Sequence, residues 1–354
     1  MDLSIAAILA QDGIASGAIY ALLALALVLV FSVTRVILIP QGEFVAFGAL
    51  TMAALQAHVF PQTVTLLVAL GVLVFLIDAC GCLGVLRRHP ERRSAAVRLL
   101  LTGFARDVFL PALLWIAVRS LAVHALPMPV QVVLTLAVVV PTGPLIYRLA
   151  FQPLAEASVL VLLIVAVGVH FALTGLGLVM FGAEGSRTTA FTDARFDLGG
   201  LSVAGQSIVI IGVAAILIVA LYLYFERTLS GKALRATAIN RLGAQLVGIG
   251  TIGAGRLAFT LAAAIGTVCG ILIAPLTTIY YDSGFLIGLK GFVGAIIGGL
   301  ASYPVAAAGA ITVGLLEAYA SFWASAFKEV IVFTLIIPIL LWRSLHASHT
   351  DEDE

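Results

Sequence analysis

Long runs of apolar residues are the feature that most constrains what this chain can fold into. A helix needs about 20 mainly apolar residues to cross the hydrocarbon layer of a membrane. Hydrophobic residues make up 62% of the 354 residues and charged residues only 10%, whereas soluble proteins average about 45–50% and about 25%. The sequence therefore predicts an all-α fold, a polytopic transmembrane helix bundle of about eleven spans, at 13–33, 42–59, 63–86, 108–126, 130–148, 158–180, 207–225, 257–281, 284–301, 304–324 and 328–342.

Two of these expected spans are unusual in composition. The segment 108–126 contains Pro111 and Arg119, and the segment 284–301 is short, rich in glycine and contains Lys290. Either could be a re-entrant or tilted segment instead of a full span. No Lys or Arg precedes the first apolar run, so we expect that run to be structural and not a cleavable signal peptide.

Several other classes of protein are excluded by residues that the sequence does not contain. The net charge is +1, and no basic stretch alternates with aromatic residues, so we expect no nucleic-acid partner. Cys80, Cys82 and Cys269 lie in apolar stretches and form neither a metal-binding nor a disulfide pattern. There is no metalloprotease pair, serine-hydrolase elbow or phosphate-binding loop. We therefore expect no catalytic residue, metal or cofactor, and any ATP hydrolysis must take place on another chain.

The orientation in the membrane follows from the distribution of Lys and Arg, which gather on the cytoplasmic side. An odd number of spans puts the two termini on opposite sides. With the C-terminus inside, the cytoplasmic set contains 14 of the 19 basic residues, at 35, 87, 88, 92, 93, 98, 106, 148, 227, 232, 235, 241, 256 and 343. We therefore expect an N-out, C-in topology, with cytoplasmic loops at 87–107 and 226–256 and an acidic cytoplasmic tail at 344–354.

The loop 226–256 has a pattern of its own. Leu234, Ala238, Leu242 and Leu246 recur at helical spacing, and Gly248 and Gly250 are stop signals. This pattern predicts one or two short amphipathic helices that dock on a partner, the alternative being a solvated linker. The outside loop 181–206 is polar, with a turn expected at Gly199-Gly200.

Polar groups within the membrane are costly and are the default functional candidates. Glu43 follows Pro40, Gln41 and Gly42, which predict non-helical backbone between the first two spans. The other candidates are Lys290, Glu317 and Asp78. Each could instead have a structural role, which we favour for Asp78; Lys290 could extend toward the membrane surface or pair with Glu317. We expect His170 to be a hydrogen-bonding residue between packed helices.

Several blocks of the sequence resemble the permeases of bacterial branched-chain amino-acid ABC importers, the LivH-like subunit. They cover most of 13–59 and 145–343 and lie at 16–25 (SGAIYALLAL), 41–44 (QGEF), 231–240 (GKALRATAIN), 284–292 (GFLIGLKGF), 298–302 (GGLAS) and 314–318 (GLLEA). The chain departs from the family at 38–40, which reads LIP where members usually have Asn-Phe-Ala. The residues 63–126 resemble an inserted two-span hairpin, which leaves nine family-like spans.

The resemblance implies a single permease domain, 1–343, without catalytic activity, in the bacterial inner membrane. Its expected partners are a second related permease, two cytoplasmic ATPase subunits, a periplasmic solute-binding protein and membrane lipid. ATPase coupling would fall on Gly231, Lys232, Arg235, Asn240, Leu242, Ala244 and Gly248, and the translocation path or gate on Gln41, Glu43, Lys290 and Glu317. We expect the hairpin 63–126, with only Asp78 and Arg119 charged well inside its helices, at the periphery. The alternatives are an ATP-independent secondary carrier or channel for a small polar solute and, less favoured, a membrane enzyme.

The predicted topology can be tested by cysteine labelling in intact cells. In a variant without the native cysteines, Arg92→Cys and Asn240→Cys should both be protected from a membrane-impermeant maleimide. Both should react after the membrane is made permeable. Labelling of either residue from the outside would contradict the orientation that the charge distribution predicts.

Overall fold

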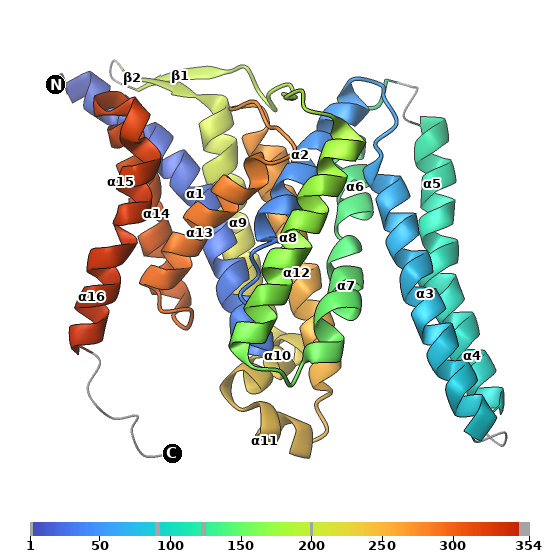
Figure 1. Ribbon diagram of the computed structural model, residues 1–354. Helices are drawn as coiled ribbons and strands as arrows, with labels where there is room; N and C mark the ends of the chain where they lie inside the picture. The colour runs from blue at the N-terminus through green and yellow to red at the C-terminus, as the bar shows by residue number, and fades with distance from the viewer. Residues whose placement is uncertain (1–2, 89–92, 122–124, 199–200, 347–354) are drawn as a thin grey trace. The chain divides into compact units, whose positions relative to one another are not determined.

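The structure of the chain is a computed structural model that describes residues 3–88, 93–121, 125–198 and 201–346. It is built from helices and one short β-hairpin (Figure 1). The helices are α1 (Leu3–Thr34), α2 (Gln41–Gln56), α3 (Thr63–Arg88), α4 (Arg93–Phe104), α5 (Leu110–Leu121), α6 (Met128–Val139), α7 (Thr142–Ile146), α8 (Val159–Phe181), α9 (Gly205–Arg227), α10 (Leu229–Ile239), α11 (Arg241–Leu246), α12 (Thr251–Ile273), α13 (Ser283–Ile297), α14 (Tyr303–Trp323), α15 (Lys328–Thr334) and α16 (Ile336–His346). Strand β1 (Arg195–Leu198) pairs antiparallel with β2 (Leu201–Ala204).

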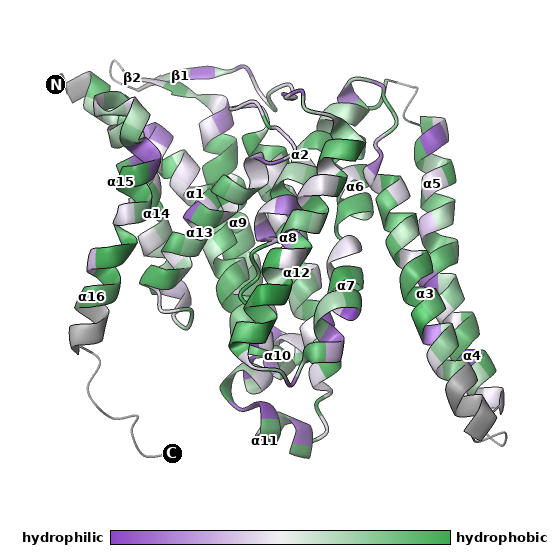
Figure 2. Ribbon diagram, viewed as in Figure 1, coloured by the Kyte–Doolittle hydropathy of each residue, from purple (hydrophilic) through white to green (hydrophobic). Residues whose placement is uncertain are grey.

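The expected helix bundle is confirmed. Within the described residues, eight helices are long and apolar enough to cross a membrane. The described residues of the predicted spans are mostly helical, but α2 and α13 are short, with 16 and 15 residues. The predicted span 130–148 is divided between α6, α7 and a following π-turn, and the last predicted span is divided into α15 and α16. Hydrophobic residues dominate the helices, whereas hydrophilic ones gather in the α10–α11 segment (Figure 2).

Several predicted boundaries were wrong. The segment 108–126 is the second half of a helical run that begins at Arg93, so most of the expected loop 87–107 is helical. Helix α12 runs from Thr251 to Ile273 and not over 257–281, because Pro275 cannot continue a helix. The expected turn at Gly199-Gly200 lies outside the described residues, between the paired Leu198 and Leu201.

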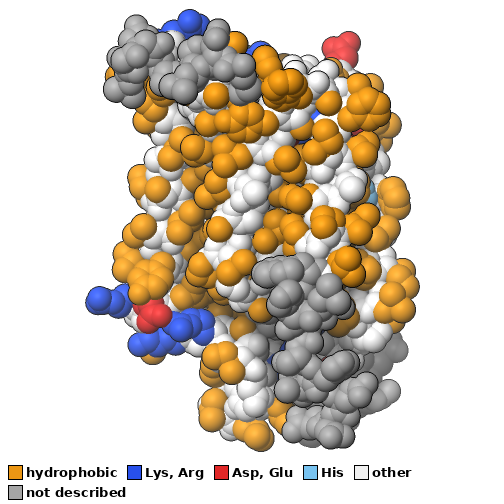
Figure 3. All heavy atoms as spheres, turned by 90° about the vertical axis from the view of Figure 1, so that its left-hand side faces the viewer, with side chains coloured by type: hydrophobic (Ala, Val, Ile, Leu, Met, Phe, Trp, Pro, Cys, Tyr) orange, Lys and Arg blue, Asp and Glu red, His pale blue; other side chains and the backbone are white. Residues whose placement is uncertain are grey.

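The chain divides into two compact units. The first contains Met1–Gly42, Thr189–Ile249 and Phe285–Glu354, and the second contains Glu43–Thr188 and Gly250–Gly284. On the molecular face shown in Figure 3, the side chains are largely hydrophobic and Lys and Arg side chains gather near its ends. Such a face suits contact with lipid, with the charges at the level of the headgroups.

Small residues set the distances between helices in both units. In the first unit, a Cβ on Gly17 of α1 would lie 2.8 Å from the Cα of Ile311 in α14. In the second, a Cβ on Gly48 of α2 would lie 2.8 Å from the carbonyl oxygen of Thr267 in α12. Lipid tails are as apolar as the side chains, so helices in a membrane associate largely through such close packing.

The helical run from α4 to α5 contains a defect in its regular hydrogen bonding. Pro111 has no N–H, so it cannot bond to the carbonyl of Asp107 four residues earlier. The backbone opens there into a π-turn, Ala105–Phe109. The Asp107 carbonyl faces Gly71 of α3 so closely that a Cβ at residue 71 would overlap it. A second π-turn, Tyr147–Phe151, ends two residues before Pro153 in the same way.

This contact predicts different effects for two glycines of the same helix. Gly71→Ala should destabilise the protein by about 1–3 kcal/mol, because the new methyl group forces α3 and the π-turn apart. Gly81→Ala should be neutral or slightly stabilising, because a Cβ there meets nothing within 4 Å. Thermal unfolding in detergent measures both effects. Equal melting temperatures for the two variants would contradict the predicted contact.

Candidate functional site

The connection between α1 and α2 is a buried stretch of non-helical backbone. Helix α1 ends at Thr34, and Arg35 follows with a φ of 61°. Leu38 is 1% exposed although it lies in no helix, and the backbone N–H of Gln41 donates to its carbonyl at 3.1 Å. The predicted break is therefore present, but at 35–40; Gly42 and Glu43 already belong to the first turn of α2. Such backbone is tolerated at membrane depth where protein or a cavity surrounds it.

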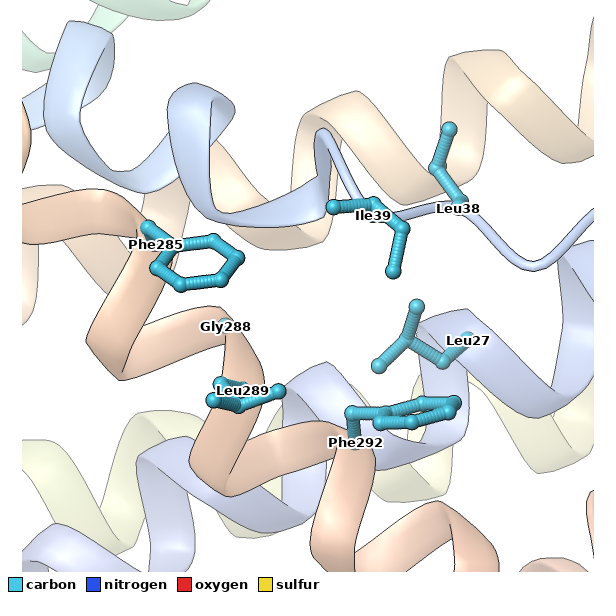
Figure 4. A pocket seen from close by; sticks show the side chains of 7 residues that line it. All are labelled: Leu27, Leu38, Ile39, Phe285, Gly288, Leu289 and Phe292. Carbon is cyan, nitrogen blue, oxygen red and sulfur yellow. The ribbon is translucent and has the colours of Figure 1, made fainter. Parts of the chain in front are cut away.

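A narrow apolar constriction adjoins this break in the first unit (Figure 4). Its walls come from α1, the 35–40 segment and α13, and its volume is about 10 Å³. That volume is about one water-sized sphere. The lining has no charged side chain; it consists of Leu27, Leu38, Ile39, Phe285, Gly288, Leu289 and Phe292. Gly288 allows α13 to approach Gly42, since a Cβ there would lie 2.9 Å from the backbone of that residue.

Glu43 is a buried carboxylate with a histidine partner. It is 2% exposed, and its Oε1 lies 2.6 Å from Nδ1 of His170 on α8. Thr174 donates to the same oxygen at 3.4 Å. Among the described residues, Oε2 of Glu43 has no hydrogen-bond partner. His170 therefore has the expected role of a hydrogen-bonding residue between packed helices. Gln41, which is 1% exposed, lies at the start of the same helix as Glu43.

Lys290 and Glu317 form a buried ionic network in the first unit. Lys290 Nζ donates to Oε1 of Glu317 at 2.5 Å and to Oε1 of Glu329 at 3.2 Å. The Tyr20 hydroxyl donates to the other oxygen of Glu317 at 2.6 Å. One sequence-based alternative was a pair between Lys290 and Glu317, which the structure contains. Tyr20 and Glu329 were not predicted as further partners, because no local sequence pattern marks residues so far apart in the chain.

The segment between α9 and α12 consists of two short helices, as the periodicity predicted. The Thr228 hydroxyl accepts from the N–H of Gly231 at 3.0 Å and caps α10, and Asn240 Oδ1 accepts from the N–H of Gly243 at 2.8 Å and caps α11. Gly248, with a φ of 86°, ends α11. Asn240 and Gly248 thus define where these two helices begin and end.

The residues predicted for coupling lie on two different faces. Leu234 and Ala244 are 1% and 3% exposed, and Gly231 contacts the backbone of Tyr224 and Phe225 in α9. Lys232 is exposed, Arg241 is half-buried, and exposed Arg235 pairs with Glu226. The prediction that Leu234 and Ala238 belong to the outward apolar face was wrong, because Leu234 is only 1% exposed and Ala238 is half-buried. The outward face, here called the α10–α11 patch, consists of Ile239, Leu242, Leu246 and Val247, which are 84%, 67%, 81% and 76% exposed.

The hairpin 63–126 contains charged residues within its helical segments that the sequence did not predict there. Arg148 donates to Asp107 at 2.6 Å and also pairs with Asp78. Arg106 binds both carboxylate oxygens of Asp107, at 2.7 and 2.8 Å. The expectation of only Asp78 and Arg119 within these helices was therefore wrong, because Arg106 and Asp107 were assigned to a loop. The structural role favoured for Asp78 agrees with its pairing to Arg148.

One family of known proteins matches nearly the whole chain. The family described as the branched-chain amino acid transport system / permease component matches residues 9–340. The chain belongs to this family. The LivH-like resemblance is thereby confirmed, and the chain is a multi-pass protein of the inner membrane.

Three relatives illustrate the match, each 29% identical. The high-affinity branched-chain amino acid permease BraD of Pseudomonas aeruginosa aligns over 208 residues, 57% of this chain and 68% of that protein. LivH of Escherichia coli aligns over 203 residues, 55% and 66% of the two chains, and a probable LivH of Methanocaldococcus jannaschii over 205 residues, 56% and 65%. The aligned region thus spans about two thirds of these relatives. No solved structure matches significantly.

The ionic network predicts a specific pattern of stabilities. Lys290→Met should destabilise the protein by about 3–5 kcal/mol, because it leaves the buried Glu317 without its cation. The double variant Lys290→Met/Glu317→Gln should lose clearly less than the sum of the two single losses. Glu329→Gln, which removes the longer and more exposed contact, should cost under about 1 kcal/mol. Thermal unfolding measures all four variants, and strictly additive losses would exclude the pairing.

Proposed function

We propose that this chain is the pore-forming permease subunit of an ABC importer that translocates branched-chain or related amino acids by alternating access. It has no catalytic role of its own. It pairs with a second related permease, two cytoplasmic ATPase subunits and a periplasmic solute-binding protein. Membership of the permease family favours this function over an ATP-independent carrier or channel.

The observation that carries the proposal is the α10–α11 patch. Its four large apolar side chains are 67–84% exposed. They lie on, or directly after, two short capped helices that are not among the long apolar helices able to cross a membrane. A short helix with exposed anchors fits a groove on a partner protein. The exposed Lys232 and the half-buried Arg241 supply positive charge near the patch. We infer that the ATPase subunit binds here and that its closure moves α10 and α11.

The translocation path runs beside the non-helical segment 35–40. Interrupted helices are the usual place for solute contacts in membrane transporters. An apolar constriction lined by leucine, isoleucine and phenylalanine suits the aliphatic side chain of a branched-chain amino acid, and its volume of about 10 Å³ corresponds to a closed gate. Gln41 and Glu43, at the start of α2, supply polar groups for the solute, and the Lys290–Glu317 pair stabilises the gate.

Alternating access needs places where the chain can bend. The chain passes from one unit to the other at four places, after Gly42, Thr188, Ile249 and Gly284. Gly42 and Gly284 lie in the first turns of the short helices α2 and α13. Motion about hinges at element ends is a common way for such transitions to proceed. We propose that these two glycines serve as hinges. The proposal includes eleven spans, N-out and C-in, with the patch and the acidic tail 344–354 in the cytoplasm.

Substitution at the centre of the patch tests the coupling. Leu242→Asp should reduce solute uptake by at least tenfold in vesicles that contain the complete transporter, because loss of a groove-filling anchor costs about 2 kcal/mol or more. The solute-stimulated part of the ATPase activity should disappear. Expression and thermal stability should be unchanged, since the side chain is 67% exposed.

Leu229→Asp is the matched control. Leu229 is 87% exposed at the other end of α10, roughly 15 Å along the helix from Ile239, so this variant should keep normal uptake. Normal uptake and stimulated ATPase activity in Leu242→Asp would mean that the segment is a solvated linker. Equal loss in both variants would show that the effect does not depend on the patch.

A further inference from the structure

A larger cavity lies where the hairpin 63–126 meets the rest of the second unit. Its volume is about 320 Å³, against about 10 Å³ for the apolar constriction. Most of its wall is apolar. Leu67 and Pro111 come from the hairpin, Val140 and Pro141 from the turn between α6 and α7, and Pro144 and Leu145 from α7. Its polar wall contains three arginines, Arg106, Arg148 and Arg256, together with Asp107 and Thr260.

The charges around this cavity do not cancel. Asp107 accepts from Arg106 and Arg148, and Asp78 pairs with Arg148, so the two carboxylates are satisfied by two of the arginines. The side chain of Arg256 donates to the amide oxygen of Gln152, at 3.3 Å from Nε and 3.1 Å from Nη2. The two hydrogen bonds of the Arg256 guanidinium thus reach a neutral acceptor. The side chain of Arg106 remains 56% exposed.

The apolar and basic parts of the cavity wall together indicate which kind of ligand can bind there. An apolar wall favours hydrocarbon over water, whereas the guanidinium groups favour a phosphate, which they can bind through two parallel hydrogen bonds. The groups belong to the basic residues expected on the cytoplasmic side, and basic pockets between membrane helices on that side bind anionic lipid headgroups. We propose that this cavity binds an anionic phospholipid, its phosphate on Arg256 and Arg106 and an acyl chain along the proline-rich wall.

This site goes beyond the transport function and does not depend on which solute is carried. The hairpin supplies Leu67, Arg106 and Pro111, and the family-like part supplies Arg148 and Arg256. A lipid bound there contacts both, so it fastens the inserted helices to the rest of the second unit. Anionic lipid then stabilises the protein, whereas zwitterionic lipid of the same chain length does not.

The test is a titration of the full-length chain in detergent with dioleoyl phosphatidylglycerol or dioleoyl phosphatidylcholine, followed by thermal unfolding and native mass spectrometry. Phosphatidylglycerol should raise the melting temperature by several degrees and remain bound, and phosphatidylcholine should do neither. Arg256→Gln should weaken phosphatidylglycerol binding about tenfold, and Arg256→Lys, which keeps the charge, should weaken it less. Arg119→Gln, on α5 of the same hairpin but outside the cavity, should bind like the unaltered protein.

Three results would overturn the proposal. The first is equal stabilisation by the two lipids, and the second is equal loss in Arg256→Gln and Arg119→Gln, which would indicate unspecific attraction to the basic surface. The third is equal protection by sn-glycerol 3-phosphate, which would mean that the cavity takes a soluble phosphate instead. Should Arg256→Gln fail to fold, Arg106→Gln gives the same comparison, because Arg106 is 56% exposed.

Discussion

The hydrocarbon layer of a membrane contains no water, so each backbone group and each charge within it must find a partner in the protein. The apolar composition places most of this chain in that layer, and the requirement accounts for its internal details. The carboxylate of Glu317 meets Lys290 and Tyr20, that of Glu43 meets His170, and that of Asp107 meets two arginines. Helix α12 ends at Ile273, two residues before Pro275, which has no N–H with which to continue the helical hydrogen bonding.

The same pattern of a long helix, an extended break and a short helix occurs twice. Helix α1 is followed by 35–40 and α2, and α12 is followed by 274–282 and α13. In the first unit α13 packs on α1 through Gly291, and in the second α2 packs on α12 through Gly48. Each unit therefore combines the long helix of one half with the short helix of the other.

The sequence predicted those features that depend on local periodicity. The helices, the pair α10–α11 and the stop at Gly248 all follow from apolar spacing and from turn-forming residues. Features that depend on distant partners were not predictable. Leu234 continues the apolar face of Leu242 by spacing, yet it packs inward because α10 lies against α1 and α9. The sequence predicts a loop at Asp107 because the residues before it in the chain are rich in arginine. The π-turn that buries Asp107 depends on Pro111 and is visible only in the structure.

The segment 63–126 supplies charged partners to another part of its unit. Arg148 lies beyond this segment, in the π-turn that follows α7, but both of its carboxylate partners, Asp78 and Asp107, come from the segment. The side chain of Arg148 is only 9% exposed. An uncompensated charge at such a position is strongly destabilising, whereas a fully paired one is tolerated. The segment 63–126 therefore does more than lie beside the remaining helices of its unit. It supplies the counter-charges that allow Arg148 to be buried, and it forms one wall of the adjacent cavity.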